Sequence, residues 1–151
     1  MGKKEKTAFI SWTDRYALKV PLIDNQHKEL IKLTNALYDT CRGGSESAKD
    51  GFRKAAHAVV EYIKVHFSTE EQIMERVDYP EAAAHKEKHK AFIRMFLDEV
   101  KAFEDGKSFV PNEFANILRE WTLTHIAITD KQLGDHLLAM AKKGEFNLGL
   151  G

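Results

Sequence analysis

Apolar residues recur every three to four positions along four long segments of the chain, which is the spacing of amphipathic helices. Short runs containing glycine, proline or aspartate interrupt the pattern between these segments. The predicted helices cover residues 24–40, about 47–77, 80–104 and 113–143. Because the connections are short, consecutive helices are expected to run antiparallel.

The predicted fold class is all-α: an up-down-up-down four-helix bundle formed by about residues 24–144. Residues 1–23 lack helical periodicity, and we expect them to form an extended N-terminal arm folded against the bundle. The side chains that favour this docking are Phe9, Ile10, Trp12 and Tyr16. Residues 145–151 are expected to form a flexible tail, and the length suits a single domain covering residues 1–151.

The charges of the chain balance, with 23 lysine and arginine residues against 23 aspartate and glutamate residues. No net field attracts nucleic acid or an anionic membrane, so neither is an expected partner. The single Cys41 cannot form an internal disulfide, and no apolar run approaches the roughly 20 residues of a membrane span. These features favour a cytoplasmic protein.

Several histidines and one glutamate occupy positions where the helical pattern asks for apolar residues. Each predicted helix contributes at least one of them, and the set is His27, His66, Glu70, His85, His89 and His125. A buried polar group without a partner costs about 1–3 kcal/mol. We therefore expect a shared partner that satisfies these groups together.

The spacing of these residues favours a metal site. His66 and Glu70 are four residues apart, as are His85 and His89, so each pair projects from one helix face toward a common point. A zinc protease motif is excluded because Lys86 stands where that motif needs glutamate. A mononuclear structural zinc site needs only four ligands, and the candidates exceed that number.

Asp130 is a further candidate ligand, five residues after His125. Residues with this spacing lie about 140° apart around a regular α-helix. Both side chains reach the centre of the bundle only if the inward face is wide or if a π-bulge lies between them. The sequence leaves these two alternatives open.

The seven candidates, in order, resemble the ligand pattern of the hemerythrin family, and specifically of bacterial hemerythrins. The matching segments are IDNQHKEL, HFSTEE, HKEKH and HIAITD, which contain all seven residues. The resemblance extends over nearly the whole chain, from Trp12 in the arm through Tyr79-Pro80 to the fourth predicted helix.

The resemblance implies two iron ions joined by an oxo or hydroxo bridge. One ion would be held by His85, His89 and His125. The other would be held by His27 and His66, and both would share Glu70 and Asp130. This arrangement implies an open position on the two-histidine ion, where dioxygen would bind reversibly for storage, delivery or scavenging. Such a protein is not an enzyme, although weak oxidase or peroxidase side activity is compatible with it.

Apolar walls suit reversible oxygen binding because they keep water and proton donors away. The candidates for the oxygen pocket are Ile31, Phe67, Met74, Trp121 and Thr122. Thr122 departs from the family, which commonly has leucine after this tryptophan. Its hydroxyl would either face the pocket or bond to its own helix backbone and face away. His57 and His136 are interpreted as surface residues.

Two other functions remain open. The same site is compatible with a sensor of oxygen, nitric oxide or iron that signals to an unknown protein partner. A diiron oxidase or peroxidase is less favoured, because ferritin-like oxidases use Glu-x-x-His motifs and no histidine here has glutamate three residues before it.

Overall fold

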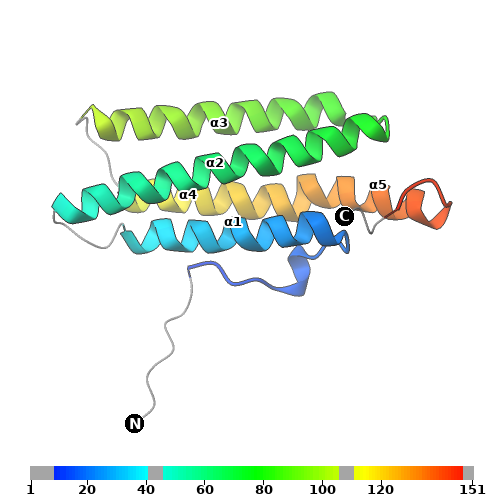
Figure 1. The fold of residues 1–151 in the computed structure, drawn as a ribbon, viewed down its shortest axis with the longest axis horizontal. Helices are drawn as coiled ribbons and strands as arrows, with labels where there is room; N and C mark the ends of the chain where they lie inside the picture. The colour runs from blue at the N-terminus through cyan, green and yellow to red at the C-terminus, as the bar shows by residue number, and fades with distance from the viewer. Residues whose placement is uncertain (1–8, 41–45, 106–110, 148–151) are drawn as a thin grey trace, which may run out of the picture.

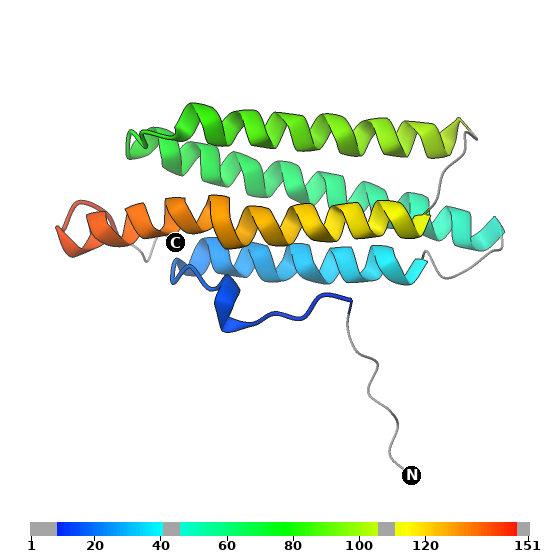
Figure 2. The same cartoon turned by 180° about the vertical axis from the view of Figure 1, so that it is seen from behind.

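The computed structural model describes residues 9–40, 46–105 and 111–147. Four long helical rods run side by side and alternate in direction along the chain (Figures 1 and 2). The first three rods are α1 (Pro21–Thr40), α2 (Glu46–Arg76) and α3 (Ala82–Glu104). The fourth consists of α4 (Pro111–Thr124), the π-helical segment η2 (His125–Asp130) and α5 (Lys131–Lys142).

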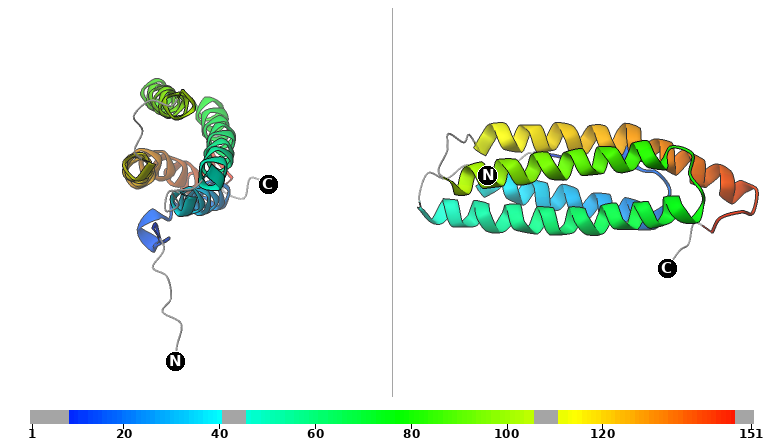
Figure 3. Two further views of the ribbon diagram at one scale, coloured as in Figure 1. Left: turned by 90° about the vertical axis from the view of Figure 1, so that its left-hand side faces the viewer. Right: turned by 90° about the horizontal axis from the view of Figure 1, so that it is seen from above.

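Seen end-on, the rods occupy the four corners of a bundle, with the N-terminal arm outside α1 (Figure 3). This confirms the predicted all-α, up-down-up-down bundle. Within the described ranges, none of the helices combines the length and apolar character that a membrane span requires.

Helix α1 begins three residues earlier than the sequence pattern predicts. Pro21 is its first residue, a position that suits proline because its fixed φ fits a helix start and it has no N–H to leave unpaired. The carboxylate of Asp24 accepts hydrogen bonds from the backbone N–H groups of Leu18 (2.8 Å) and Lys19 (3.1 Å). Asp24 therefore anchors the end of the arm to the first turn of the helix.

The predicted start of the third helix at Pro80 is wrong by two residues. Pro80 lies in the turn between α2 and α3, where the N–H of Tyr79 donates to the carbonyl of Met74 (2.9 Å). Regular helical bonding starts when the N–H of His85 donates to the carbonyl of Glu81 (2.9 Å). The fourth rod includes Pro111, which the pattern placed just before it.

The arm packs along α1, as the sequence predicts. Ile10 and Asn35 exchange two hydrogen bonds of 2.8 Å, and the ring of Phe9 stacks on that of Tyr38 at 3.9 Å. Leu18 is completely buried. The arm also contains one short 3-10 turn, η1 (Asp14–Tyr16).

The apolar core is divided into two clusters. The first is rich in aromatic residues of α2, α3 and α4, among them Phe52, Phe67, Phe92, Phe96 and Phe114. The second joins the arm to α1, α2 and α5, with Ile10, Leu18, Ile23, Met74 and Leu133 among its members. Buried polar residues occupy further inward positions along the same helices.

Only part of the predicted C-terminal tail is described. The side chain of Phe146 is half-buried and packs against the second cluster. Residues 148–151 lie outside the described ranges, as do Cys41 and residues 1–8.

Candidate metal centre

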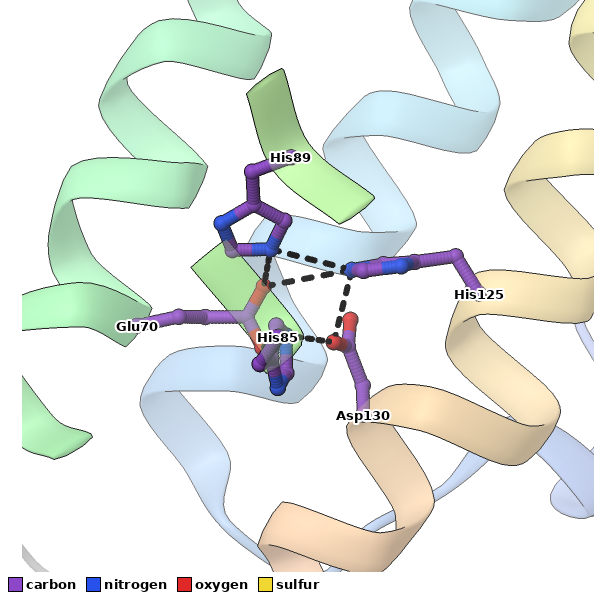
Figure 4. Close-up of side chains that lie close together, drawn as sticks. All are labelled: Glu70, His85, His89, His125 and Asp130. Atoms are coloured by element: carbon purple, nitrogen blue, oxygen red, sulfur yellow. Dashed lines mark hydrogen bonds and ion pairs between the residues drawn. The ribbon is translucent and has the colours of Figure 1, made fainter. Parts of the chain in front are cut away.

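All seven predicted ligands are buried, and they converge from all four rods. His27 comes from α1, His66 and Glu70 from α2, His85 and His89 from α3, and His125 and Asp130 from η2. The most exposed of them, His125, is only 5% exposed. Figure 4 shows five of these side chains pointing toward one another.

The i,i+4 pairs lie on single helix faces, as their spacing predicts. His66 Nε2 is 2.9 Å from Glu70 Oε1 on α2, and the rings of His85 and His89 on α3 lie edge to face at 4.5 Å. Because each pair is carried by one rigid helix, its two donor atoms reach the centre together.

The segment η2 explains how His125 and Asp130 both point inward. A regular helix would turn them about 140° apart, but the wider π-turn between them aligns their side chains. His125 Nε2 lies 2.8 Å from Asp130 Oδ1. Of the two alternatives that the sequence leaves open, the structure contains the π-helical one.

The donor atoms form two overlapping groups within which all atoms lie within 4.8 Å of one another. One group contains Glu70, His85, His89, His125 and Asp130. The other contains His27, His66, Glu70 and Asp130. The two carboxylates therefore belong to both groups, while each histidine belongs to one.

Asp130 divides its two oxygens between the groups. Oδ2 faces His27 Nε2 at 2.7 Å and His66 Nε2 at 3.5 Å. Oδ1 faces His85 Nε2 at 3.1 Å and His125 Nε2 at 2.8 Å. One oxygen toward each group is the arrangement that a carboxylate needs in order to bridge two ions.

Electrostatics couple the histidines to the two carboxylates. Burial lowers the pKa of His66, but Glu70 and Asp130 outweigh it and raise that pKa to about 10. The same opposing effects act on His125, where Asp130 and Glu70 outweigh burial and raise the pKa to about 9. Burial raises the pKa of both carboxyl groups, yet the surrounding histidines hold both below their usual range. Burial lowers the pKa of His89.

Unpaired polar atoms give an independent test of whether the site suits metal ions. Several buried atoms that face the centre make no well-directed hydrogen bond in the described part of the chain, although imidazole nitrogens and carboxylate oxygens approach one another to 2.8–2.9 Å: His66 Nε2, both carboxylate oxygens of Glu70, His85 Nε2 and Asp130 Oδ1. Leaving so many buried polar atoms without such bonds costs about 1–3 kcal/mol each. Metal ions would satisfy them together, so the residues fit a two-ion site.

Comparison with known proteins identifies the family. The sequence model of the hemerythrin family, described as "Hemerythrin HHE cation binding domain", matches residues 18–137. The chain belongs to the hemerythrin family. Proteins of this family are, in general, diiron oxygen-binding proteins rather than enzymes.

Individual hemerythrins resemble the chain over most of its length. The bacteriohemerythrin of Methylococcus capsulatus is 32% identical over 133 residues, which cover 87% of this chain and 99% of that protein. The bacteriohemerythrin of Pseudomonas aeruginosa is 32% identical over 123 residues, covering 82% and 78% respectively. A crystal structure of wild-type hemerythrin superposes with a TM-score of 0.79 at 30% identity, covering 85% of this chain and 97% of that one.

Aromatic residues line one side of this hemerythrin centre. The ring of Phe67 stacks on His89 at 3.7 Å, and Trp121 stacks on His125 at 4.5 Å. Ile31 and Met74 are buried in the second core cluster, each one helical turn after a predicted ligand. Their assignment to an oxygen pocket stays a prediction.

Thr122, the departure from the hemerythrin pattern, is fully buried. Its hydroxyl has no hydrogen-bond partner in the described ranges. The alternative in which this hydroxyl bonds to its own helix backbone is therefore wrong. Of the two histidines predicted to lie at the surface, His57 is exposed, but His136 is half-buried because its ring packs against Tyr79 at 5.1 Å.

The sequence analysis missed two polar residues beside the centre. Gln26 Oε1 lies 2.8 Å from His66 Nδ1, and Gln26 Nε2 donates to Thr69 Oγ1 at 3.1 Å. Both residues are half-buried and lie off the apolar stripes, so periodicity gave no signal for them. The signal that points to such residues is chemical, because a histidine that binds metal usually donates its second N–H to an outer polar partner.

Proposed function

We propose that this chain binds dioxygen reversibly at a carboxylate-bridged pair of iron ions, for oxygen storage, delivery or scavenging. We further propose that residues 1–151 act as one hemerythrin-like domain. The observation that carries the proposal is the division of the Asp130 oxygens between two histidine groups. A single ion would give no reason for that division.

In this proposal, one iron would be held by His85, His89 and His125, and the other by His27 and His66, with Glu70 and Asp130 available to both. When bound, the iron pair would supply the electrons for reversible binding of dioxygen. The group that contains His27 and His66 has one histidine fewer, so we expect the gas to bind on that side.

The protein's part is to hold this donor set and to keep its surroundings apolar. Phe67 and Ile31 are buried, and the half-buried Trp121 covers the face of His125. Such walls favour release of intact dioxygen because they limit the water and protons that would make its reduction irreversible. A donor set rich in imidazole, with only two carboxylates, also favours reversible binding over oxidation of a substrate.

A spectroscopic cycle tests the proposal. Metal-free protein is loaded with ferrous iron without air, aerated, and then flushed with argon. We expect two iron ions per chain and a visible absorption band that appears with oxygen and disappears under argon. A band that persists under argon while oxygen is consumed would indicate an oxidase. Uptake of a single ion would contradict the two-iron centre.

Two histidine variants provide a matched comparison for this cycle. His85→Gln removes a buried donor and is expected to reduce iron below two per chain and to abolish the reversible band. His57→Gln changes an exposed histidine outside the donor groups and should leave both unchanged. Equal losses in the two variants would show that the cycle does not report on this centre.

A further inference from the structure

A chain of three hydrogen bonds connects His66 to the half-buried face between α1 and α2. Its members are His66, Gln26, Thr69 and the backbone carbonyl of Val65. Gln26 comes from α1 and the others from α2, so the chain also ties the two helices together.

The far end of this chain fixes the direction of every bond in it. The hydroxyl of Thr69 donates its only proton to the carbonyl of Val65 at 3.0 Å. Its oxygen can then only accept, so the Gln26 amide presents its NH₂ group to Thr69 at 3.1 Å. The amide oxygen of Gln26 must therefore face His66 Nδ1 at 2.8 Å.

An amide oxygen cannot donate, so the proton between Gln26 and His66 resides on Nδ1. In the neutral imidazole this leaves the lone pair on Nε2, the atom that faces Glu70 Oε1 and Asp130 Oδ2 at 2.9 and 3.5 Å. A tautomer with its proton on Nε2 would be unable to bind a metal there.

We propose that Gln26 is a positioning residue that holds His66 in the tautomer able to bind metal through Nε2. This inference rests on the proposed metal centre, although it does not depend on whether that centre carries oxygen. By contrast, His27 Nδ1 and His89 Nδ1 have no hydrogen-bond partner among the described residues, and the carboxylate nearest to His89 Nδ1, on Glu71, lies 3.6 Å away. Loss of Gln26 should therefore weaken mainly the ion held by His66.

Titration of the metal-free, full-length protein with Zn²⁺ tests this inference. Gln26→Leu keeps the size of the side chain but removes the acceptor, and we expect the affinity of one of the two ions to fall by about 10–100-fold. Gln26→Glu retains an acceptor oxygen and should bind both ions at least as tightly as the wild type. The control is Gln72→Leu on the exposed face of α2, where the amide donates to Ser68 Oγ at 3.2 Å.

Nitrogen NMR of the zinc-loaded protein gives a second readout, because it identifies which nitrogen of His66 carries the proton. We expect Nδ1 in the wild type and loss of this protected Nδ1–H signal in Gln26→Leu. Unchanged affinity in Gln26→Leu, or equal weakening in Gln26→Leu and Gln26→Glu, would overturn the inference. If Gln26→Leu fails to fold by circular dichroism, Thr69→Val decides, because it removes only the anchor of the amide and should cause a smaller loss of the same ion.

Failure of the proposed function is distinguishable from failure of this inference. If Gln26 controls zinc binding but the ferrous protein binds oxygen irreversibly, the proposed function of reversible oxygen binding is wrong. The positioning role of Gln26 then still stands. If the wild type takes up a single zinc ion, the two-ion centre is wrong. The role of Gln26 then stands only if Gln26→Leu weakens that ion.

Discussion

At the scale of single residues, Thr122 is a buried polar side chain outside the donor groups. Its hydroxyl is fully buried and lacks a hydrogen-bond partner within the described ranges. An unpaired buried hydroxyl costs about 1–3 kcal/mol, a penalty that the leucine common at this place in the family would avoid. A hydroxyl left in this state is available to a small ligand or to a water molecule.

Thr122→Leu is expected to slow autoxidation of the oxygenated protein, because the sequence analysis places this hydroxyl in the predicted oxygen pocket, where it would act as a proton source. Stopped-flow absorbance measures the decay of the oxygenated form. Thr122→Val, which matches threonine in shape, should slow the decay as well if the hydroxyl is responsible. Equal decay rates in the wild type and both variants would contradict this prediction.

At the scale of elements, the arm and the fourth rod meet where α5 leaves the metal centre. Gly134 lies one turn after Asp130, and Leu18 of the arm packs directly on it. A Cβ atom added at Gly134 would approach two carbon atoms of Leu18 to 2.9 Å. The absence of a side chain here lets the arm lie against the rod that carries Asp130.

Gly134→Ala is expected to destabilise the protein by about 1–3 kcal/mol, because Leu18 is fully buried and has no room to move. Gly51→Ala is the matched control, since a Cβ there would meet Thr40 Cγ2 at an ordinary 3.7 Å. This control should gain up to ~1 kcal/mol from the higher helix propensity of alanine. Urea unfolding of the two variants measures both effects, and a stabilised Gly134→Ala protein would refute the close packing.

At the scale of the whole molecule, the protonation of the buried histidines depends on whether metal is bound. With pKa values raised to about 10 and about 9, His66 and His125 are protonated near neutral pH when no metal is bound. The two positive charges then balance the carboxylates of Glu70 and Asp130, whose pKa values are lowered. A metal ion has to displace these protons before the imidazoles can bind it.

Metal loading near pH 7.5 is accordingly expected to release protons. The affinity for metal should also keep rising with pH toward about 9 to 10, where His125 and His66 lose their protons without metal. In histidines with the ordinary pKa of about 6.5, the affinity would level off much earlier. An indicator dye in weakly buffered solution measures the released protons as Zn²⁺ is added. Loading without proton release at pH 7.5 would show that both imidazoles are already neutral.

Much of this architecture could be predicted because it depends on periodicity. The four amphipathic rods and the inward positions of residues such as His66 and His89 follow from residue spacing alone. The π-helical turn before Asp130 could not be chosen from spacing, because a wide inward face explained the same five-residue interval. The roles of Gln26 and Gly134 depend on contacts between elements far apart in sequence, and periodicity within one helix carries no information about such contacts.

The stack of Phe92, Trp121 and His125, with ring separations of 3.7 and 4.5 Å, gives the molecule an internal optical reporter. If His125 holds iron as proposed, an indole stacked on it would lose its excitation energy to the metal, so Trp121 should fluoresce brightly in the empty protein and dimly in the loaded one. The second tryptophan, Trp12, belongs to the arm and lies beneath the ammonium group of Lys28 at 5.1 Å. Its emission would report undocking of the arm, so the two indoles record metal content and arm position separately.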